Sequence, residues 1–167
     1  MLQIITAVPK QISIPLHEKC VVRDTLVNYP VIHYDSSNNI SSVVRYLNRE
    51  RLSYNYFIQR DGTIVKLLNP ICRASHAGIS YWQGYFPMNE YSIGICLQNI
   101  PPMPYKEVQY QSLAWLIATL TERWPDIKEH KAVGHSQIAV PRGRKKDPGP
   151  KFDWGHLDSL LAKVRLS

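Results

Sequence analysis

Long apolar runs and paired cysteines are both scarce in this sequence of 167 residues. No apolar run reaches the roughly 18 residues that a membrane-spanning helix needs, so we predict no transmembrane segment. The three cysteines, Cys20, Cys72 and Cys96, include no Cys-x-x-Cys pair and are odd in number. We therefore expect reduced thiols rather than a disulfide framework.

Acidic residues are also few. The chain has 13 Asp and Glu against 20 Lys and Arg, which gives a formal net charge of +7. Such a balance favours polyanionic surroundings, either nucleic acid, anionic lipid or an anionic polymer, although a solvated basic surface explains it equally well. The basic residues are scattered apart from residues 142–146, and no nucleic-acid-binding motif is present, so we expect no nucleic-acid partner.

The length suits one domain, and strand and helix patterns alternate along it. Residues 1–28 read as an irregular extension, because Pro9 and Pro15 interrupt any periodic pattern. Asp61-Gly62 between two apolar runs indicates a β-hairpin. We predict an α/β fold, a mixed central β-sheet flanked by helices. The predicted strands are 31–34, 54–58, 63–67, 92–98 and 132–133, and the predicted helices are 41–52, 108–124 and 157–164.

The strand predicted over residues 92–98 alternates apolar and small residues. Ile93, Ile95 and Leu97 should face the core. The other set, which includes Gly94 and Cys96, should face something that approaches the strand closely.

Two histidines lie at the ends of predicted strands, where α/β folds usually place their sites. His33 is followed by a polar loop, and His135 follows a short strand. Asp147 precedes a Pro-Gly-Pro turn that presents its carboxylate with little freedom. Two imidazoles and one carboxylate with a fourth position open are typical of a catalytic zinc site.

Lys145 lies two residues before Asp147, so in an extended segment both side chains point the same way. An ammonium beside a metal could stabilise the oxyanion that forms when hydroxide attacks a carbonyl. Each signal alone has a simpler explanation. A strand histidine is more often a hydrogen-bonded core residue, and Lys-Lys-Asp in a loop is more often a solvated charge run.

Several motifs in order resemble zinc-dependent N-acetylmuramoyl-L-alanine amidases of the AmpD-like family, which is related to the peptidoglycan recognition proteins. The resemblance spans about residues 29–165. The motifs are Val31-Ile32-His33-Tyr34, Ser53-Tyr54-x-Tyr56 with Arg60-Asp61-Gly62, Ser75-His76-Ala77-Gly78, Trp82-Gln83-Gly84, Asn89-x-x-Ser92-Ile93-Gly94, Gly134-His135-Ser136 and Arg144-Lys145-x-Asp147-Pro148-Gly149-Pro150.

This resemblance implies a single amidase domain over residues 1–167 that binds one Zn²⁺ and cleaves the amide between the muramoyl lactyl group and L-alanine. It implies His33, His135 and Asp147 as zinc ligands. Lys145 matches the lysine that polarises the tetrahedral intermediate, and Tyr54 matches a tyrosine that assists in some branches. The candidate substrate-binding residues are His76, Trp82 and Asn89.

Cys96 departs from the AmpD-type pattern, which has a glutamate that acts as the base at this position. Three alternatives follow. Zinc, Lys145 and Tyr54 could suffice; Cys96 could add a thiolate contact to the metal; or the domain could bind muropeptide with an impaired catalytic site. A thiol replaces a buried carboxylate poorly, because its pKa rises in an apolar site.

The resemblance also sets the expected partners and location. We expect peptidoglycan fragments as substrate and a monomeric protein. The first residues lack the basic cluster and cleavage site of a signal peptide, so we expect a cytoplasmic location. A secreted or periplasmic protein, or a phage-encoded lytic enzyme whose leader is absent, is the alternative.

Overall fold

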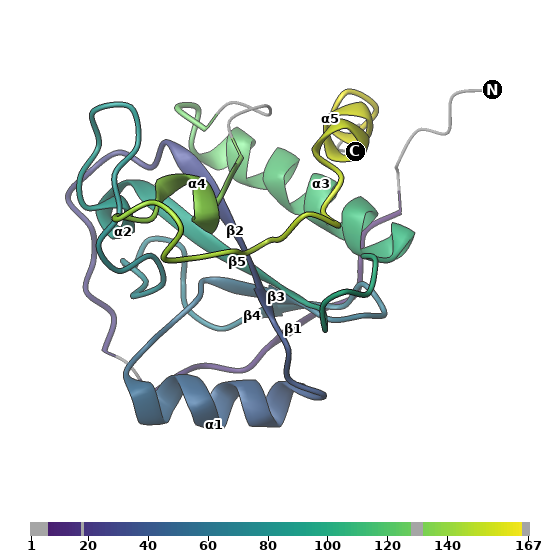
Figure 1. Cartoon of the computed structure of the whole chain (residues 1–167), viewed down its shortest axis with the longest axis horizontal. Coiled ribbons are helices and arrows are strands. Elements are labelled where there is room, and N and C mark those ends of the chain that lie inside the picture. Colours follow the sequence, from purple (N-terminus) through teal and green to yellow (C-terminus); the bar gives the residue numbers. More distant parts are fainter. Residues whose placement is uncertain (1–6, 18, 128–131, 165–167) are drawn as a thin grey trace.

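The computed structural model describes residues 7–17, 19–127 and 132–164. These residues form a six-stranded sheet in the order β1-β4-β3-β5-β2-β6 (Figure 1). The pair β3–β4 is antiparallel, and the other neighbouring strands are parallel. The mixed sheet confirms the predicted fold class. The strands are β1 (Gln11–Ser13), β2 (Tyr29–Asp35), β3 (Tyr56–Ile58), β4 (Ile64–Lys66), β5 (Ser92–Gln98) and β6 (Val133–Gly134).

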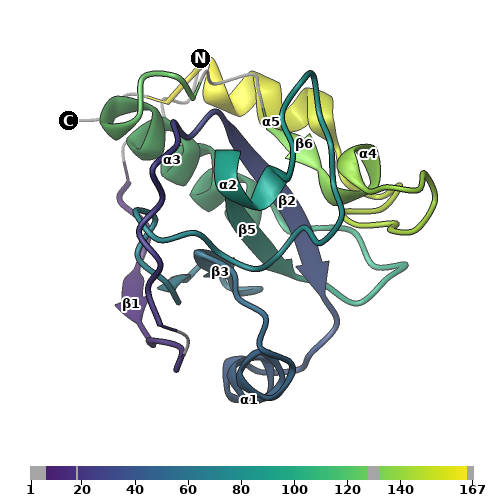
Figure 2. The same cartoon turned by 90° about the vertical axis from the view of Figure 1, so that its left-hand side faces the viewer.

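Helices cover both faces of the sheet. Helices α3 and α5 lie on one side and α1 lies on the other (Figure 2). The short helices α2 and α4 precede β5 and follow β6, respectively. Among the described residues, no helix has the length and apolarity needed to cross a bilayer. The helices are α1 (Ile40–Glu50), α2 (Met88–Tyr91), α3 (Glu107–Arg123), α4 (His135–Ile138) and α5 (Trp154–Leu161).

Strand β5 has one face toward the main core and the other toward the residues predicted to bind a metal, as its alternation of apolar and small residues predicts. Ile93, Ile95 and Leu97 are fully buried in the cluster that includes the apolar face of α3. The alternate residues point the other way, where Cys96 packs with Phe57 and α1 residues in a second cluster. One face of β5 therefore stabilises the fold, and the opposite face lies under the site.

Local signals set the other boundaries. The Asn39 side chain caps α1 by accepting a hydrogen bond from the Ser42 amide at 3.0 Å. The predicted hairpin joins β3 to β4, and Gly62 adopts φ +84°, a conformation that favours glycine. The predicted helices correspond to α1, α3 and α5 within a few residues.

The prediction of an irregular extension over residues 1–28 was wrong in part. Strand β1 pairs in parallel with β4, with Gln11 opposite Ile64. All three β1 residues are exposed, so an edge strand formed there without the apolar alternation that would reveal it. Residues 1–6 and 18 of that range lie outside the described residues.

The expectation of reduced thiols was also wrong for two of the three cysteines. Cys20 and Cys72 form a disulfide, with a Cα–Cα distance of 5.2 Å, while Cys96 is a buried free thiol. The two partners are 52 residues apart in sequence, so their spacing gives no sign of pairing. An antiparallel bridge between Val22 and Cys72 brings the two segments together.

The segment around Cys20 is also held by Arg23. Its guanidinium donates hydrogen bonds to the carbonyls of Cys72, Asn89, Glu90 and Ser92 at 2.8–3.4 Å. The N-terminal segment is therefore bound to both the 72–77 loop and the junction of α2 with β5.

Candidate active site

The sheet topology brings the two predicted histidine ligands together. Strands β2 and β6 are parallel neighbours, with Ile32 opposite Gly134. The next residues, His33 and His135, therefore lie side by side, and their ring centroids are 4.6 Å apart. Both side chains are buried, with 1% and 3% of their surface exposed.

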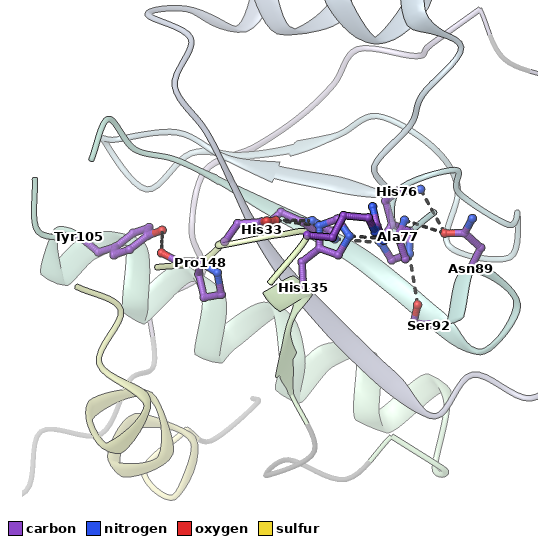
Figure 3. Close-up of polar contacts among 10 residues, drawn as sticks. His33, His76, Ala77, Asn89, Ser92, Tyr105, His135 and Pro148 are labelled. Carbon is purple, nitrogen blue, oxygen red and sulfur yellow. Dashed lines mark hydrogen bonds and ion pairs between the residues drawn. The ribbon is translucent and has the colours of Figure 1, made fainter. Parts of the chain in front are cut away.

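Asp147 completes the group from the loop after α4. Its Oδ2 lies 2.9 Å from His33 Nδ1 and 3.0 Å from His135 Nδ1. Two hydrogen bonds hold this loop. The Ser136 amide donates to the Asp147 carbonyl at 2.8 Å. The Tyr105 hydroxyl donates to the Pro148 carbonyl, also at 2.8 Å (Figure 3). The predicted turn thus presents the carboxylate to both imidazoles.

Burial and charge fix the protonation of these groups. Burial lowers the pKa of His33 to about 4. Burial acts to raise the pKa of Asp147, but its close contacts with the His135 and His33 imidazoles outweigh burial and lower that pKa below its usual value. At neutral pH the site therefore holds a neutral His33 and an ionised Asp147.

The donor set fits a divalent metal ion. Among the described residues, the ligand atoms of His33, His135 and Asp147 form a group in which all lie within 4.8 Å of one another. The far nitrogens are already bonded, His135 Nε2 to the Ala77 carbonyl at 3.0 Å and His33 Nε2 to His76 Nδ1 at 2.9 Å. Three electron-pair donors converge, and two nitrogens and one oxygen are a set that suits Zn²⁺.

The group opens into a cleft of about 520 Å³, within the size range of small-molecule sites. Lys145 is exposed and lines this cleft together with Asp147 and His135. Tyr54 lines it as well, with its ring centroid 5.0 Å from that of His33. Lys145 and Asp147 therefore border the same cavity.

Cys96 lies beside the ligands but outside the ligand group. In the sheet it is directly opposite His33, and its thiol is hydrogen-bonded to the Tyr54 hydroxyl. Burial raises the pKa of the Cys96 thiol well above its usual value, and burial raises the pKa of Tyr54 in the same way. Both groups are therefore protonated at neutral pH.

The three candidate substrate-binding residues lie in different surroundings. His76 lines the cleft, but it is only 8% exposed and packs behind His33. Asn89 Oδ1 accepts hydrogen bonds from the amides of His76 and Ala77 at 3.2 and 2.8 Å. Trp82 packs against the cluster that contains Tyr29 and Met88.

Sequence reasoning gave no role to three groups that the structure places around the ligands. Ser92 bonds to His76, and Tyr105 holds Pro148. Arg144, which lies within a recognised motif, donates to the carbonyls of Ala77 and Ile79 at 3.1 and 2.6 Å. The contacts of Tyr105 and Arg144 are made to backbone carbonyls, which no side-chain pattern reveals.

The fold and the His-His-Asp cluster at the ends of parallel strands define an α/β protein with a candidate metal site. Comparison with known sequences identifies its family. Residues 23–150 match the N-acetylmuramoyl-L-alanine amidase family (amidase type 2), and the chain belongs to that family. Its relatives include amidases named AmpD.

Two curated relatives carry the name 1,6-anhydro-N-acetylmuramyl-L-alanine amidase AmpD. The protein from Enterobacter cloacae is 42% identical over 110 residues, which cover 66% of this chain and 57% of that protein. The Escherichia coli K12 protein is 42% identical over 113 residues, covering 68% and 60%. The aligned part thus spans less than two thirds of the length of these relatives.

Solved structures show the same fold. A selenomethionine derivative of AmpD superposes with a TM-score of 0.75 at 30% identity and covers 99% of both chains. AmpDh3 from Pseudomonas aeruginosa in complex with anhydromuramic pentapeptide gives a TM-score of 0.70 at 32% identity, covering 78% of this chain and 58% of that one.

Proposed function

We propose that this protein is a zinc-dependent N-acetylmuramoyl-L-alanine amidase. Its substrate would be a peptidoglycan fragment, cleaved at the amide between the lactyl group of a muramoyl or 1,6-anhydro-muramoyl sugar and L-alanine. The observation that carries this proposal is the convergence of two imidazole nitrogens and the Asp147 carboxylate beside the exposed Lys145. The names of the AmpD relatives and the muropeptide bound to AmpDh3 support the substrate class.

The residues that would hold Zn²⁺ are His33, His135 and Asp147. Bound there, the ion would supply a water whose pKa is lowered to about 7 and a positive charge near the scissile carbonyl. The Lys145 ammonium would donate a hydrogen bond to the carbonyl oxygen as that oxygen gains negative charge. Because Lys145 borders the cleft without being buried, it can meet the substrate while keeping its solvated charge.

Proton transfer is where this site departs from the AmpD-type pattern. Neither the Cys96 thiol nor the Tyr54 hydroxyl is ionised at neutral pH, so neither can accept a proton as a carboxylate would. Solvent in the open cleft would take the proton instead, and Tyr54 could relay it. General-base assistance is typically worth about 10²–10⁴ in rate, so we expect slower turnover than a glutamate-containing site gives.

The Cys20–Cys72 disulfide bears on where the protein acts. Disulfides persist in secreted and periplasmic proteins and are rare in the cytoplasm. We therefore favour the alternative of an oxidising compartment over the expected cytoplasmic location. Alkylation of the protein unfolded in urea without reductant, followed by mass spectrometry, should label one cysteine of the three, the otherwise buried Cys96. Labelling of all three would support a reduced, cytoplasmic protein.

The test of the activity is a digest of anhydro-muramoyl tripeptide by the purified, zinc-loaded protein, followed by chromatography. We expect release of free peptide, loss of activity on chelation, and recovery when zinc is restored. His135→Ala should remove both zinc binding and peptide release. Stoichiometric zinc with bound muropeptide and no cleavage over hours would instead indicate a binding module with an impaired site.

A further inference from the structure

A chain of hydrogen bonds leads from the candidate ligands into the protein. His76 Nδ1 lies 2.9 Å from His33 Nε2, and the two rings are perpendicular (Figure 3). The other nitrogen of His76, Nε2, lies 3.2 Å from the Ser92 hydroxyl. Neither His76 nor Ser92 has a role in the chemistry proposed above.

The last hydrogen bond of this series, from Ser92 to Met88, sets the direction of the others. The Ser92 hydroxyl donates its single proton to the Met88 carbonyl, because a carbonyl can only accept. Ser92 must then accept from His76 Nε2, which leaves His76 Nδ1 as an acceptor. His33 therefore donates from Nε2, and the lone pair on its Nδ1 faces the ionised Asp147 carboxylate at 2.9 Å. Two acceptors this close need a cation between them, so these bond directions are those of the metal-loaded site.

The backbone next to His76 does the same for the second histidine. The Ala77 carbonyl accepts from His135 Nε2 at 3.0 Å, so the lone pair of His135 also lies on Nδ1. Asn89 holds this dipeptide in place, since its side-chain oxygen accepts from the amides of both His76 and Ala77. One short segment thus orients both imidazoles.

The His76 imidazole packs directly against Gly94 of β5. A Cβ added at Gly94 would lie 2.6 Å from Cγ of His76, closer than real contacts allow. Any larger residue at position 94 would displace the imidazole from its position behind His33. The contact between His76 and His33 therefore requires a glycine at position 94.

We propose that His76, Ser92 and Asn89 are positioning residues that fix both imidazole ligands with Nδ1 toward the metal. The inference rests on the metal site of the proposed function. Groups that orient a ligating histidine in this way typically change metal affinity by about 10–100-fold when they are removed.

The experiment compares zinc affinity, measured by competition with a chromophoric chelator, in two variants of similar size. His76→Leu removes the acceptor for His33 and should weaken zinc binding about 10–100-fold. His76→Asn can place its Oδ1 near the original Nδ1 and should retain most of the affinity. His156→Leu, which removes a histidine paired with Glu107 away from the site, should bind zinc as the unaltered protein does.

The outcomes separate this inference from the proposed function. If His76→Leu binds zinc as tightly as the unaltered protein, or if Leu and Asn weaken binding equally, the positioning role is overturned. If the unaltered protein binds no zinc, the metal site itself fails. Thermal melts of each variant check folding.

A second measurement does not depend on replacing His76. Long-range ¹H–¹⁵N NMR of the zinc-loaded protein should show His33 and His76 both protonated on Nε2. Ser92→Ala removes the acceptor of His76 Nε2 and should shift His76 toward a mixture of its two neutral forms. A His33 protonated on Nδ1 in the zinc-loaded protein, or a His76 signal unchanged by Ser92→Ala, would contradict the inference.

Discussion

The two halves of the candidate site are held in different ways. The imidazole half, His33, His76 and His135, is buried, and hydrogen bonds fix it from behind. The loop half, residues 144–148, carries the exposed Lys145 beside the more enclosed Asp147. This difference separates two tasks. Under the proposed function, the buried half would set where a metal lies and how strongly it is held, and the exposed half would meet the substrate.

Lys145→Ala should produce the largest effect that separates the two halves. Loss of one preorganised donor to an oxyanion typically lowers kcat about 10²–10³-fold. Zinc affinity and the free energy of unfolding should stay unchanged, because Lys145 is exposed and is not a ligand. Steady-state kinetics with muropeptide and chelator competition measure the two quantities. Lys151→Ala, another exposed lysine, is the matched control.

A fall in zinc affinity for Lys145→Ala equal to that of His76→Leu would contradict the division into two halves.

Removal of the Cys20–Cys72 disulfide should weaken the support of the buried half. A covalent link across 52 residues typically contributes about 2–4 kcal/mol. The double variant Cys20→Ser, Cys72→Ser should lose about that much free energy of unfolding in urea. Reductant should destabilise the unaltered protein similarly and leave the double variant unchanged. Equal stability of the oxidised protein and the double variant would argue against this bond in solution.

Cys96→Glu tests whether position 96 still acts as the base position. A carboxylate there should raise kcat, although burial beside the charges of Asp35 and Asp147 limits the gain. We expect about tenfold, below the usual range for general-base catalysis. Cys96→Gln has nearly the same shape without a base and is the matched control. No gain of Glu over Gln would indicate that this position takes no part in proton transfer.

The buried half should also give the metal-free protein a dependence on pH. His33 has a pKa near 4 when folded against about 6.5 when unfolded, so the unfolded chain binds more protons between these values. The free energy of unfolding should fall as pH drops from 6.5 toward 4, by up to about 1.4 kcal/mol per pH unit. His76, whose pKa burial also lowers, adds to this slope.

Urea unfolding at a series of pH values measures that slope, and His76→Asn should reduce it. A stability that stays constant from pH 6.5 to 4 would contradict burial of neutral imidazoles.

The parts of the fold that could be predicted are those with their own local signal. Strand β5 has the predicted bounds, because apolar and small residues alternate along it. The candidate ligand group also has a local signal, since His33 lies in one recognisable strand, His135 follows another, and Asp147 precedes a rigid turn.

What was missed depends on partners far apart in the sequence. Strand β1 has no buried face, so only its pairing with β4 defines it. Cys20 meets Cys72 because the backbone at Val22, two residues on, pairs with Cys72 itself. His76 lies in a loop, where the local sequence does not reveal what its side chain contacts. Its surroundings arise from Ser92 and Gly94, which follow it by more than a dozen residues.

The guanidinium of Arg23 has a practical consequence for anyone who trims this chain. A shortened protein that began at β2 would keep all three candidate ligands. It would also keep every strand of the sheet except the edge strand β1. It would nevertheless lose the cation that gathers the carbonyls of Asn89 and Ser92, the same two residues that brace His76. A minimal domain should therefore start before Cys20.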